Sequence, residues 1–218
     1  MDALTIRRAA PGDTEFLIEA ICESDRSGTS ILSYCGLFDL GLEEFEAVLR
    51  GVLAEDVAGH EFCLSGFLVA ELDSVPVGAC AGWVEGVGGA PSAILKSAVL
   101  FGSLPEHSVV AARRYQEPMK ELAIVREPGA MQIEFVYVPE TFRGRGIARK
   151  LIVGHIESMR SEADTPKAQV ILSATNAAAK AVYLKAGFLP VMERWTSSQD
   201  LASILPSSGR LLMERSIS

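Results

Sequence analysis

The amino-acid sequence predicts a single α/β (α+β) domain spanning residues 1–218, and three observations lead to this class. Six to seven short segments have the apolar or alternating pattern of strands, and the segments between them repeat apolar residues at helical spacing. A strand at 131–138 runs through a glycine-rich turn directly into an amphipathic helix. The 218 residues, 49% hydrophobic and 22% charged, are enough for one well-filled core.

The first part of the chain predicts one strand and two helices. Residues 4–9 alternate and precede a Pro-Gly-Asp turn, whereas 15–21 and 41–54 have helical spacing. Residues 27–40 lie between the two helices and are rich in Ser and Gly, which predicts a loop. This loop also contains apolar side chains, so we expect it to pack against another part of the fold.

The middle of the chain predicts a hairpin and a less regular segment. Residues 66–72 and 75–84 read as two strands joined by a two-residue turn. Residues 85–130 begin with glycines and a proline and continue with two weakly helical stretches, 92–104 and 108–125.

The strand at 131–138 ends at Pro139, and strict alternation along it defines two faces. One face would carry Ile133, Phe135 and Tyr137. The other would carry Gln132, Glu134, Val136 and Val138.

The last part of the chain predicts a helix, a mostly apolar strand, a second helix and a closing hairpin. The apolar strand is typical of a parallel neighbour covered on both faces. The elements are a helix at 145–160, a strand at 169–175, a helix at 176–187, and strands at 190–197 and 210–217. The connector between the last two strands has room for one helical turn.

The turn at 143–148 has the layout of an anion site at a helix start. The first N–H groups of a helix have no intrahelical partner, and Gly144 and Gly146 let the backbone approach a phosphate that a Cβ would keep away. Arg143 and Arg145 add charge-assisted donors beside it.

Two common phosphate loops are excluded by spacing. A P-loop needs Lys and Ser or Thr after its last glycine, whereas Ile147 and Ala148 follow Gly146 here. The dinucleotide-binding fingerprint needs a third glycine at the position of Arg149.

A second motif follows one strand later. Residues 176–188 have the form Asn-x-x-Ala-x-x-x-Tyr-x-x-x-Gly-Phe, and the earlier turn has the form Arg143-x-x-Gly146-x-Ala148. In this order and spacing, the pair resembles the pyrophosphate loop and following helix of the GNAT superfamily of acyl-CoA-dependent N-acetyltransferases. Asn176 is also a good helix N-cap in its own right.

The resemblance implies a mixed, mostly antiparallel central sheet of six to seven strands with helices on both faces, splayed between strands 4 and 5. It implies acetyl-CoA as the acyl donor, with the pantetheine arm lying along strand 4 and the pyrophosphate held by the glycine turn. The residues expected to bind it are Val136, Val138, Arg143, Gly144, Arg145, Gly146, Ile147, Ala148 and Asn176. Residues 85–130 are then an insertion, because a minimal chain of this family needs far fewer residues there.

The resemblance also implies roles for two titratable residues. Tyr183 matches the tyrosine that protonates the departing sulfur, although a tyrosine at the border of the core is the simpler structural explanation. Glu134 is the best candidate for the base, although a strand carboxylate in an ion pair explains it equally well. The N–H of Val136 is expected to stabilise the oxyanion, by analogy with the family's strand 4 amide.

The function expected from this resemblance is transfer of acetyl from acetyl-CoA to a primary amine by direct attack, without a covalent enzyme intermediate. A small-molecule acceptor is favoured over a protein, and the acceptor side is expected in residues 27–40 or in the 85–130 insertion. Tyr34 and Phe38 are candidate acceptor contacts, although packing that anchors the loop is the favoured explanation for both. Two alternatives remain: a non-catalytic acyl-CoA-binding or regulatory module, and an acetyltransferase of protein N-termini or lysines. A homodimer is also open.

Composition and charge argue against several other classes. A formal net charge of −8 disfavours a nucleic-acid-binding surface. The cysteines and histidines lack metal-ligand spacing, so no metal site is expected. No apolar run approaches the roughly 20 residues that span a bilayer, and no signal-peptide layout is present, so a cytoplasmic protein is expected.

Overall fold

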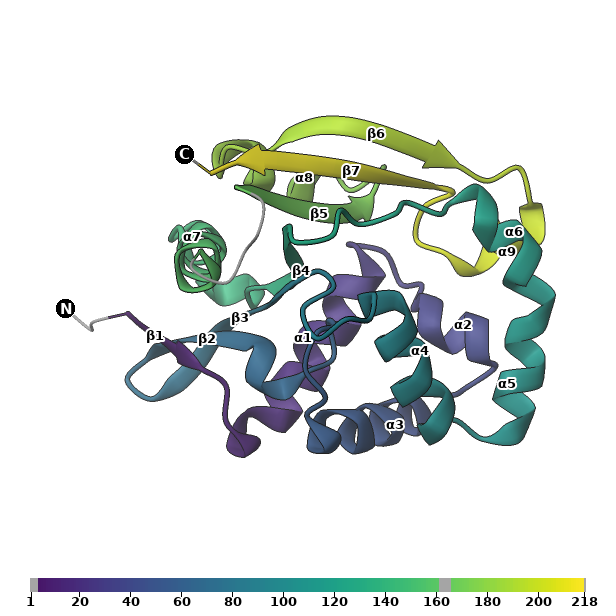
Figure 1. Ribbon diagram of the computed structural model, residues 1–218. Coiled ribbons are helices and arrows are strands. Elements are labelled where there is room, and N and C mark those ends of the chain that lie inside the picture. The colour runs from purple at the N-terminus through teal and green to yellow at the C-terminus, as the bar shows by residue number, and fades with distance from the viewer. Residues whose placement is uncertain (1–3, 161–165, 218) are drawn as a thin grey trace.

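The computed structural model describes residues 4–160 and 166–217, whose strands form one seven-stranded sheet in the order β1-β2-β3-β4-β5-β7-β6 (Figure 1). Neighbouring strands pair antiparallel except β4 and β5, which are parallel. This is the mixed, mostly antiparallel sheet that the sequence predicts. Residues 1–3, 161–165 and 218 of the predicted domain lie outside the described residues.

The strands fall where the sequence places them. They are β1 Thr5–Arg8, β2 Phe67–Leu72, β3 Val75–Val84, β4 Met131–Tyr137, β5 Lys167–Ser173, β6 Leu189–Trp195 and β7 Gly209–Ser216. The predicted two-residue turn between β2 and β3 is confirmed, since Asp73 and Ser74 both have positive φ, 51° and 65°. Two left-handed residues give the turn whose twist matches that of the flanking strands.

The helices are also close to their predicted positions, with one addition. They are α1 Thr14–Arg26, α2 Ser33–Phe38, α3 Leu42–Glu55, α4 Ser92–Ser103, α5 Glu106–Ala112, α6 Gln116–Glu121, α7 Ile147–Met159, α8 Ala177–Lys185 and α9 Gln199–Ile204. The addition is α2, which lies in the segment 27–40 predicted as a loop. The predicted turn before β7 is α9.

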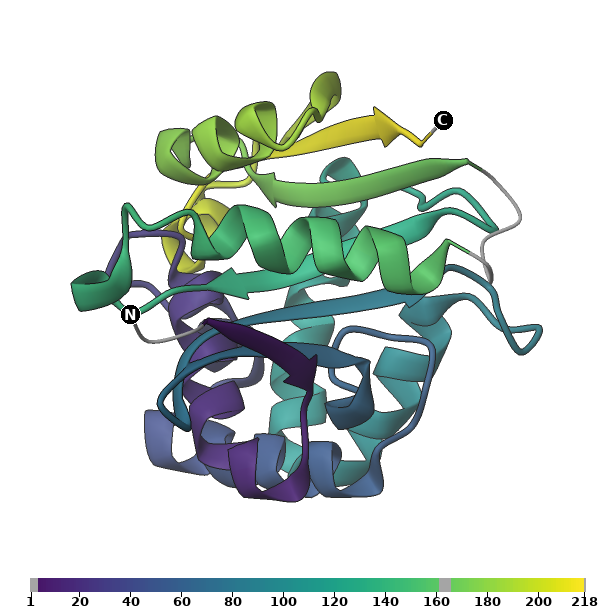
Figure 2. The ribbon, with the colours of Figure 1, turned by 90° about the vertical axis from the view of Figure 1, so that its left-hand side faces the viewer.

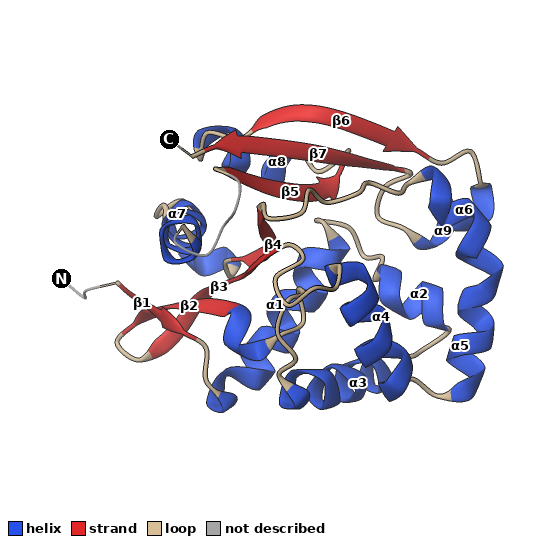
Figure 3. Cartoon of the chain, in the orientation of Figure 1, coloured by secondary structure: helices blue, strands red, loops and turns tan. Residues whose placement is uncertain are grey.

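Helices cover both faces of the sheet, and each face has its own core (Figures 2 and 3). Under α7 and α8, apolar side chains such as Leu151 and Ile156 pack on one face. On the opposite face, α1 and α3 bury residues such as Leu17 and Leu49, and α4 joins the same cluster. Helices therefore lie on both faces of the sheet, as predicted, while the edge strand β6 is exposed along its length.

Strand β4 contains a bulge at Phe135, whose φ is +50°. Ala81 of β3 lies opposite Glu134, but Ala79 lies opposite Tyr137, so three steps along β4 match two along β3. An extra residue of this kind interrupts the alternation of side chains between the two faces.

The predicted faces of 131–138 are wrong because of this bulge. Ile133 packs in the core under α7 together with Val136 and Val138. Glu134 was predicted to share the face of those two valines, but it points to the opposite side, where its carboxylate meets Arg126. The carboxylate is therefore on the face covered by the N-terminal helices.

Strands β4 and β5 separate soon after they meet. Their parallel pairing joins Met131 to Ala168 and Gln132 to Gln169. At this fork the two buried glutamines are hydrogen-bonded, with Gln132 Nε2 donating to Gln169 Oε1 at 2.9 Å. The predicted splay between the fourth and fifth strands is confirmed.

Candidate active site

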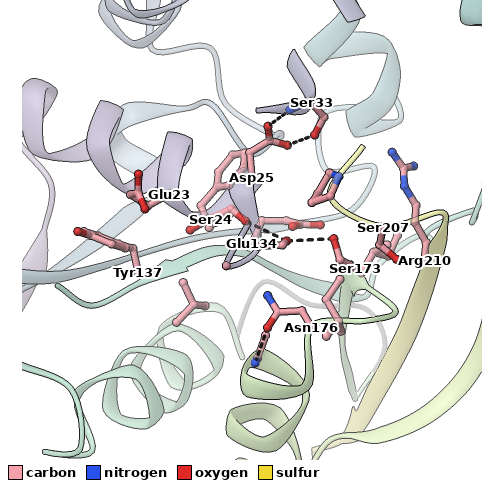
Figure 4. Close-up of a pocket in the computed structure, with 18 of the residues that line it drawn as sticks. Glu23, Ser24, Asp25, Ser33, Glu134, Tyr137, Ser173, Asn176, Ser207 and Arg210 are labelled. Atoms are coloured by element: carbon pink, nitrogen blue, oxygen red, sulfur yellow. Dashed lines mark hydrogen bonds between the residues drawn. The ribbon is translucent and has the colours of Figure 1, made fainter. Parts of the chain in front are cut away.

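A cavity of about 480 Å³ lies where β4 and β5 diverge (Figure 4). Segments that are distant in sequence form its walls: the end of α1 and the loop after it, the bulged half of β4, the end of β5, the start of α8 and the start of β7. The hydroxyl of Ser173 on β5 donates to that of Ser27 after α1 at 3.0 Å, which joins two of these walls.

Seven of the eleven residues predicted for the site line this cavity. They are Glu134, Val136, Val138, Arg143, Ala148, Asn176 and Tyr183. The side chain of Ile147 is instead buried in the core, 3% exposed. Gly144, Arg145 and Gly146 belong to the same turn but are not among the lining residues.

The glycine turn has the backbone geometry that its sequence demands. Gly144 and Gly146 have φ of +78° and +76°, which few residues with a Cβ adopt. Gly146 is the N-cap of α7, and no side chain caps this helix start. The first N–H groups of α7 are therefore available to an anion such as a pyrophosphate.

The two arginines of the turn differ in their contacts. Arg143 Nε donates to the carbonyl oxygen of Val138 at 3.0 Å, which ties the turn to the end of β4. The Arg145 guanidinium lies 5.4 Å from the ring centroid of Phe142. Both cations therefore lie beside the start of α7.

The second motif begins α8 with the predicted N-cap. Asn176 Oδ1 accepts a hydrogen bond from the Ala179 N–H at 3.0 Å, and Gly187 ends the motif with φ +88°. Tyr183 lines the cavity and is 5% exposed, and its ring packs edge-on against Phe188. Burial raises the pKa of Tyr183 well above its usual value, so the phenol is neutral and can donate a proton.

Glu134 faces the cavity from the bulged part of β4. Arg126 Nη2 donates to Glu134 Oε1 at 2.6 Å. Burial raises the pKa of Glu134 to about 7, with the Glu61 carboxylate adding to the shift and Arg126 opposing it. A carboxyl group with this pKa can exchange a proton near neutral pH.

A second ion pair lies in the same wall. Lys96 Nζ is 2.6 Å from Glu61 Oε1, and Lys96 belongs to α4 of the predicted insertion. Burial alone would raise the pKa of Glu61, but the positive charges of Lys96 and Arg126 outweigh it and hold the pKa at about 2. Glu61 is therefore ionised while Glu134 titrates near neutrality.

The loop after α1 contributes both structure and cavity wall. Asp25 accepts hydrogen bonds from the backbone N–H and the hydroxyl of Ser33, which fixes the start of α2. Tyr34 lines the cavity, and its ring stacks on Phe45 at 5.2 Å. Phe38 is buried in the core and is not among the lining residues.

Several cavity residues carry no local signal in the sequence. They come from segments far apart in the sequence, as the separation of 35 positions between Glu61 and Lys96 illustrates. No motif connects such positions, so only the fold brings them together. The cavity-lining charges that sequence reasoning missed are Glu23, Asp25, Glu61, Lys96, Arg126 and Arg210.

The described residues include neither a metal-binding cluster nor a membrane-spanning helix. Within 4–160 and 166–217, no three His, Cys, Asp or Glu side chains gather as a metal ion would require. In that same part of the chain, no helix has both the length and the apolar character needed to cross a membrane.

Comparison with known proteins identifies the family of this chain. The acetyltransferase (GNAT) family model matches residues 37–188, which is more than half of the chain. No curated protein matches the sequence significantly.

Solved structures share the fold at low sequence identity. An N-acetyltransferase from Staphylococcus aureus Mu50 has a TM-score of 0.67 and 19% identity, over 96% of this chain and 99% of its own. A ribosomal-protein-alanine N-acetyltransferase from Brucella melitensis has a TM-score of 0.54 and 19% identity, over 98% and 99%. The Salmonella typhimurium protein yncA, solved with its cofactor acetyl-CoA, has a TM-score of 0.53 and 15% identity, over 99% and 95%.

The family model, the forked sheet and the glycine turn agree with one another and with the sequence motifs. The chain belongs to the GNAT family of acetyltransferases, whose members use acetyl-CoA.

Proposed function

We propose that this protein transfers the acetyl group of acetyl-CoA to a primary amine by direct attack within a ternary complex. The observation that carries the proposal is the shared cavity: Glu134, Tyr183 and the end of the glycine turn all border it. An anion site, a proton acceptor and a neutral proton donor are the groups that amine acetylation from a thioester needs.

Acetyl-CoA would lie along the diverging half of β4. Beyond Gln132 this strand has no registered partner on the β5 side, so Val136 and Val138 can bind an extended pantetheine arm as a neighbouring strand would. The turn from Arg143 to Ala148 would hold the pyrophosphate, with Gly144, Arg145, Gly146 and Ile147 contributing backbone groups. The Asn176 Oδ1 caps α8, which leaves its amide nitrogen to contact the pantetheine arm.

Proton transfers would involve two side chains. The amine nitrogen forms the new bond to the carbonyl carbon, and Glu134 takes the proton that the amine loses. The carbon–sulfur bond breaks, and the Tyr183 phenol protonates the departing sulfur. The Val136 N–H would stabilise the oxygen while it carries negative charge.

Residues 85–130 form part of the cavity wall, and this favours a small molecule as the amine acceptor. Lys96, Ile124 and Arg126 from this segment line the cavity. We propose that the segment is an insertion within one domain and that it covers the acceptor side. A cover of this kind restricts the acceptor to a molecule that fits inside the cavity.

The experiment is a thiol-release assay with acetyl-CoA and a panel of primary amines that includes peptides. Amine-dependent release of CoA with a small amine would support the proposal. Binding of CoA, seen as a thermal shift, with no release for any amine would identify a non-catalytic module instead. Release with peptides alone would contradict the small-molecule acceptor.

A further inference from the structure

Arg210 supplies a positive charge to the cavity that the proposed chemistry does not use. It is the second residue of β7, where it lies opposite Ser173 of β5, and it lines the cavity (Figure 4). Burial lowers the pKa of its guanidinium, with Tyr34, Glu134 and Asp25 among the groups that oppose this effect. Arg210 therefore lies among the acceptor-side residues.

The other cations of the cavity have partners, and Arg210 has none among the described residues. Lys96 pairs with Glu61, Arg126 pairs with Glu134, and Arg143 donates to a backbone carbonyl. The Arg210 backbone pairs with β5 and β6, but no hydrogen bond or ion pair joins its guanidinium to residues 4–160 or 166–217. Arg210 is only half-buried, so its guanidinium can meet a molecule in the cavity, and its fork of donors fits a carboxylate or phosphate.

The neighbouring strand does not supply the missing charge. The residue opposite Arg210 on β6 is Arg194, so the ladder places a second cation there. Like charges directly across a ladder repel each other. The arrangement therefore favours an anion near Arg210 that comes from outside the chain.

Buried polar atoms without partners occur on the same walls. Within the described part of the chain, Ser24 Oγ, Glu61 Oε2 and Arg126 Nε have no hydrogen-bond partner, and all three residues line the cavity. Buried polar groups are normally satisfied, so these atoms indicate a polar occupant. Glu61 Oε2 can accept from an ammonium group, whereas Arg126 Nε can only donate.

We infer that the acceptor is a small amine that also carries an anionic group, and that Arg210 binds this anion. This inference rests on the proposed function and names its substrate class, an amino-acid-like molecule with carboxylate or phosphate as the anion. Glu61 and Glu134 receive the ammonium end, and Arg210 receives the anionic end. The two charged ends then orient the amine in the cavity.

The test compares matched amines that differ only in the anion. Suitable pairs are phenylalanine with phenethylamine, lysine with cadaverine, and phosphoethanolamine with ethanolamine, each assayed for CoA release by the wild-type protein. We expect kcat/KM to be at least about 10-fold higher for an anionic member, which is typical for losing a partner of a buried charged group. The amino-acid and phosphate pairs separate the two kinds of anion.

Three variants locate the effect. Arg210→Met should lower the ratio of kcat/KM for the amine with the anionic group to that for its partner without it by about 10- to 100-fold, and Arg210→Lys should restore part of it. Arg160→Met removes an exposed arginine at the end of α7, which does not line the cavity, and should leave the ratio unchanged. If Arg210→Met fails to fold, the inference is still tested by Arg210→Lys and by the comparison of matched amines with the wild-type protein.

Two outcomes separate this inference from the proposed function. If amines without the anionic group are acetylated as fast as their anion-bearing partners, or if Arg210→Met leaves the ratio unchanged, the inference is wrong while the transferase activity stands. If no amine is acetylated, the proposed function fails and binding decides the inference. Thermal shifts with CoA present should then be larger for anionic amines and lost in Arg210→Met, and equal shifts would overturn it.

Discussion

Glu134 and Arg126 form an ion pair of 2.6 Å between the bulged strand β4 and the segment that precedes it, with both side chains largely buried. The pair lies in the cavity wall, so the carboxylate is held in place while it faces the cavity. Its position depends on the Phe135 bulge, which separates the face of Glu134 from that of Val136.

The pKa of Glu134 predicts the pH dependence of turnover. A base must be ionised, so kcat should fall as the pH drops through about 7, the value to which burial raises the pKa. Glu134→Gln should lower kcat by about 100-fold and remove this limb of the pH profile. The control is Glu127→Gln, which breaks the Lys167 ion pair away from the cavity and should keep the limb. A limb near pH 7 that survives in Glu134→Gln would rule out this base.

Tyr183→Phe tests the proton donor. Removing the hydroxyl should lower kcat by about 100-fold or more, while binding of acetyl-CoA should change little because the ring still packs on Phe188. The measurement is the steady-state rate of CoA release together with the CoA-induced thermal shift. Tyr115→Phe is the control, since Tyr115 is buried in a separate cluster beside α9. Equal turnover by Tyr183→Phe and wild type would show that the phenol is not the acid.

Gly146→Ala tests the turn at the start of α7. An added Cβ meets nothing within 4 Å, so the effect comes from φ +76°, which is unfavourable for Ala by about 1–2 kcal/mol. We expect a lower Tm and about 10-fold weaker CoA binding, measured by calorimetry. Gly51→Ala in α3 also adds a Cβ in open space, but it should stabilise the protein by about 0.5–1 kcal/mol. Unchanged CoA affinity in Gly146→Ala would contradict the role of the turn.

His155 predicts a loss of stability in mild acid. Its Nε2 donates to the Cys80 carbonyl at 2.6 Å, and its buried Nδ1 has no partner among the described residues. Burial therefore lowers the pKa from 6.5 to about 4. The unfolded chain binds the extra proton more readily, so stability is complete above pH 6.5 and is lost as the pH falls toward 4.

This loss should reach about 3 kcal/mol, seen as a change in the free energy of unfolding by urea. In His155→Gln, which cannot titrate, the dependence should flatten between pH 6.5 and 4. The exposed His107 provides the control, and His107→Gln should retain the wild-type slope. An unchanged slope in His155→Gln would assign the acid sensitivity to other groups.

The sequence predicts those parts of the fold whose signals are local. The Asp73 and Ser74 turn, the left-handed glycines before α7 and the Asn176 cap each depend on a few adjacent residues. The motifs at 143–148 and 176–188 could be recognised in the sequence for the same reason, because each combines a turn or cap with the helix that directly follows it. The short helix α2 was missed because six residues carry little periodicity.

The rest of the site depends on contacts that no local pattern reports. One bulge residue reverses the face of Glu134, and its position depends on pairing with β3. In the sequence, Arg210 resembles any residue at the start of a strand. It reaches the cavity only because β7 pairs with β5 at the point where β5 diverges from β4. The charged walls of the cavity were therefore beyond sequence reasoning, whereas the glycine turn and the Asn176 motif were within it.

The fork between β4 and β5 gives this sheet a third edge, in addition to the outer edges at β1 and β6. An open edge usually exposes a protein to pairing with other chains and hence to aggregation. This one borders a cavity of about 480 Å³ whose walls include residues of α1, α2, α4 and α8, so these helices flank the unpaired strand backbone. The unpaired backbone of β4 can therefore bind an extended ligand inside the cavity. It is not exposed on the outer edge of the sheet, where strands of other protein molecules could pair with it.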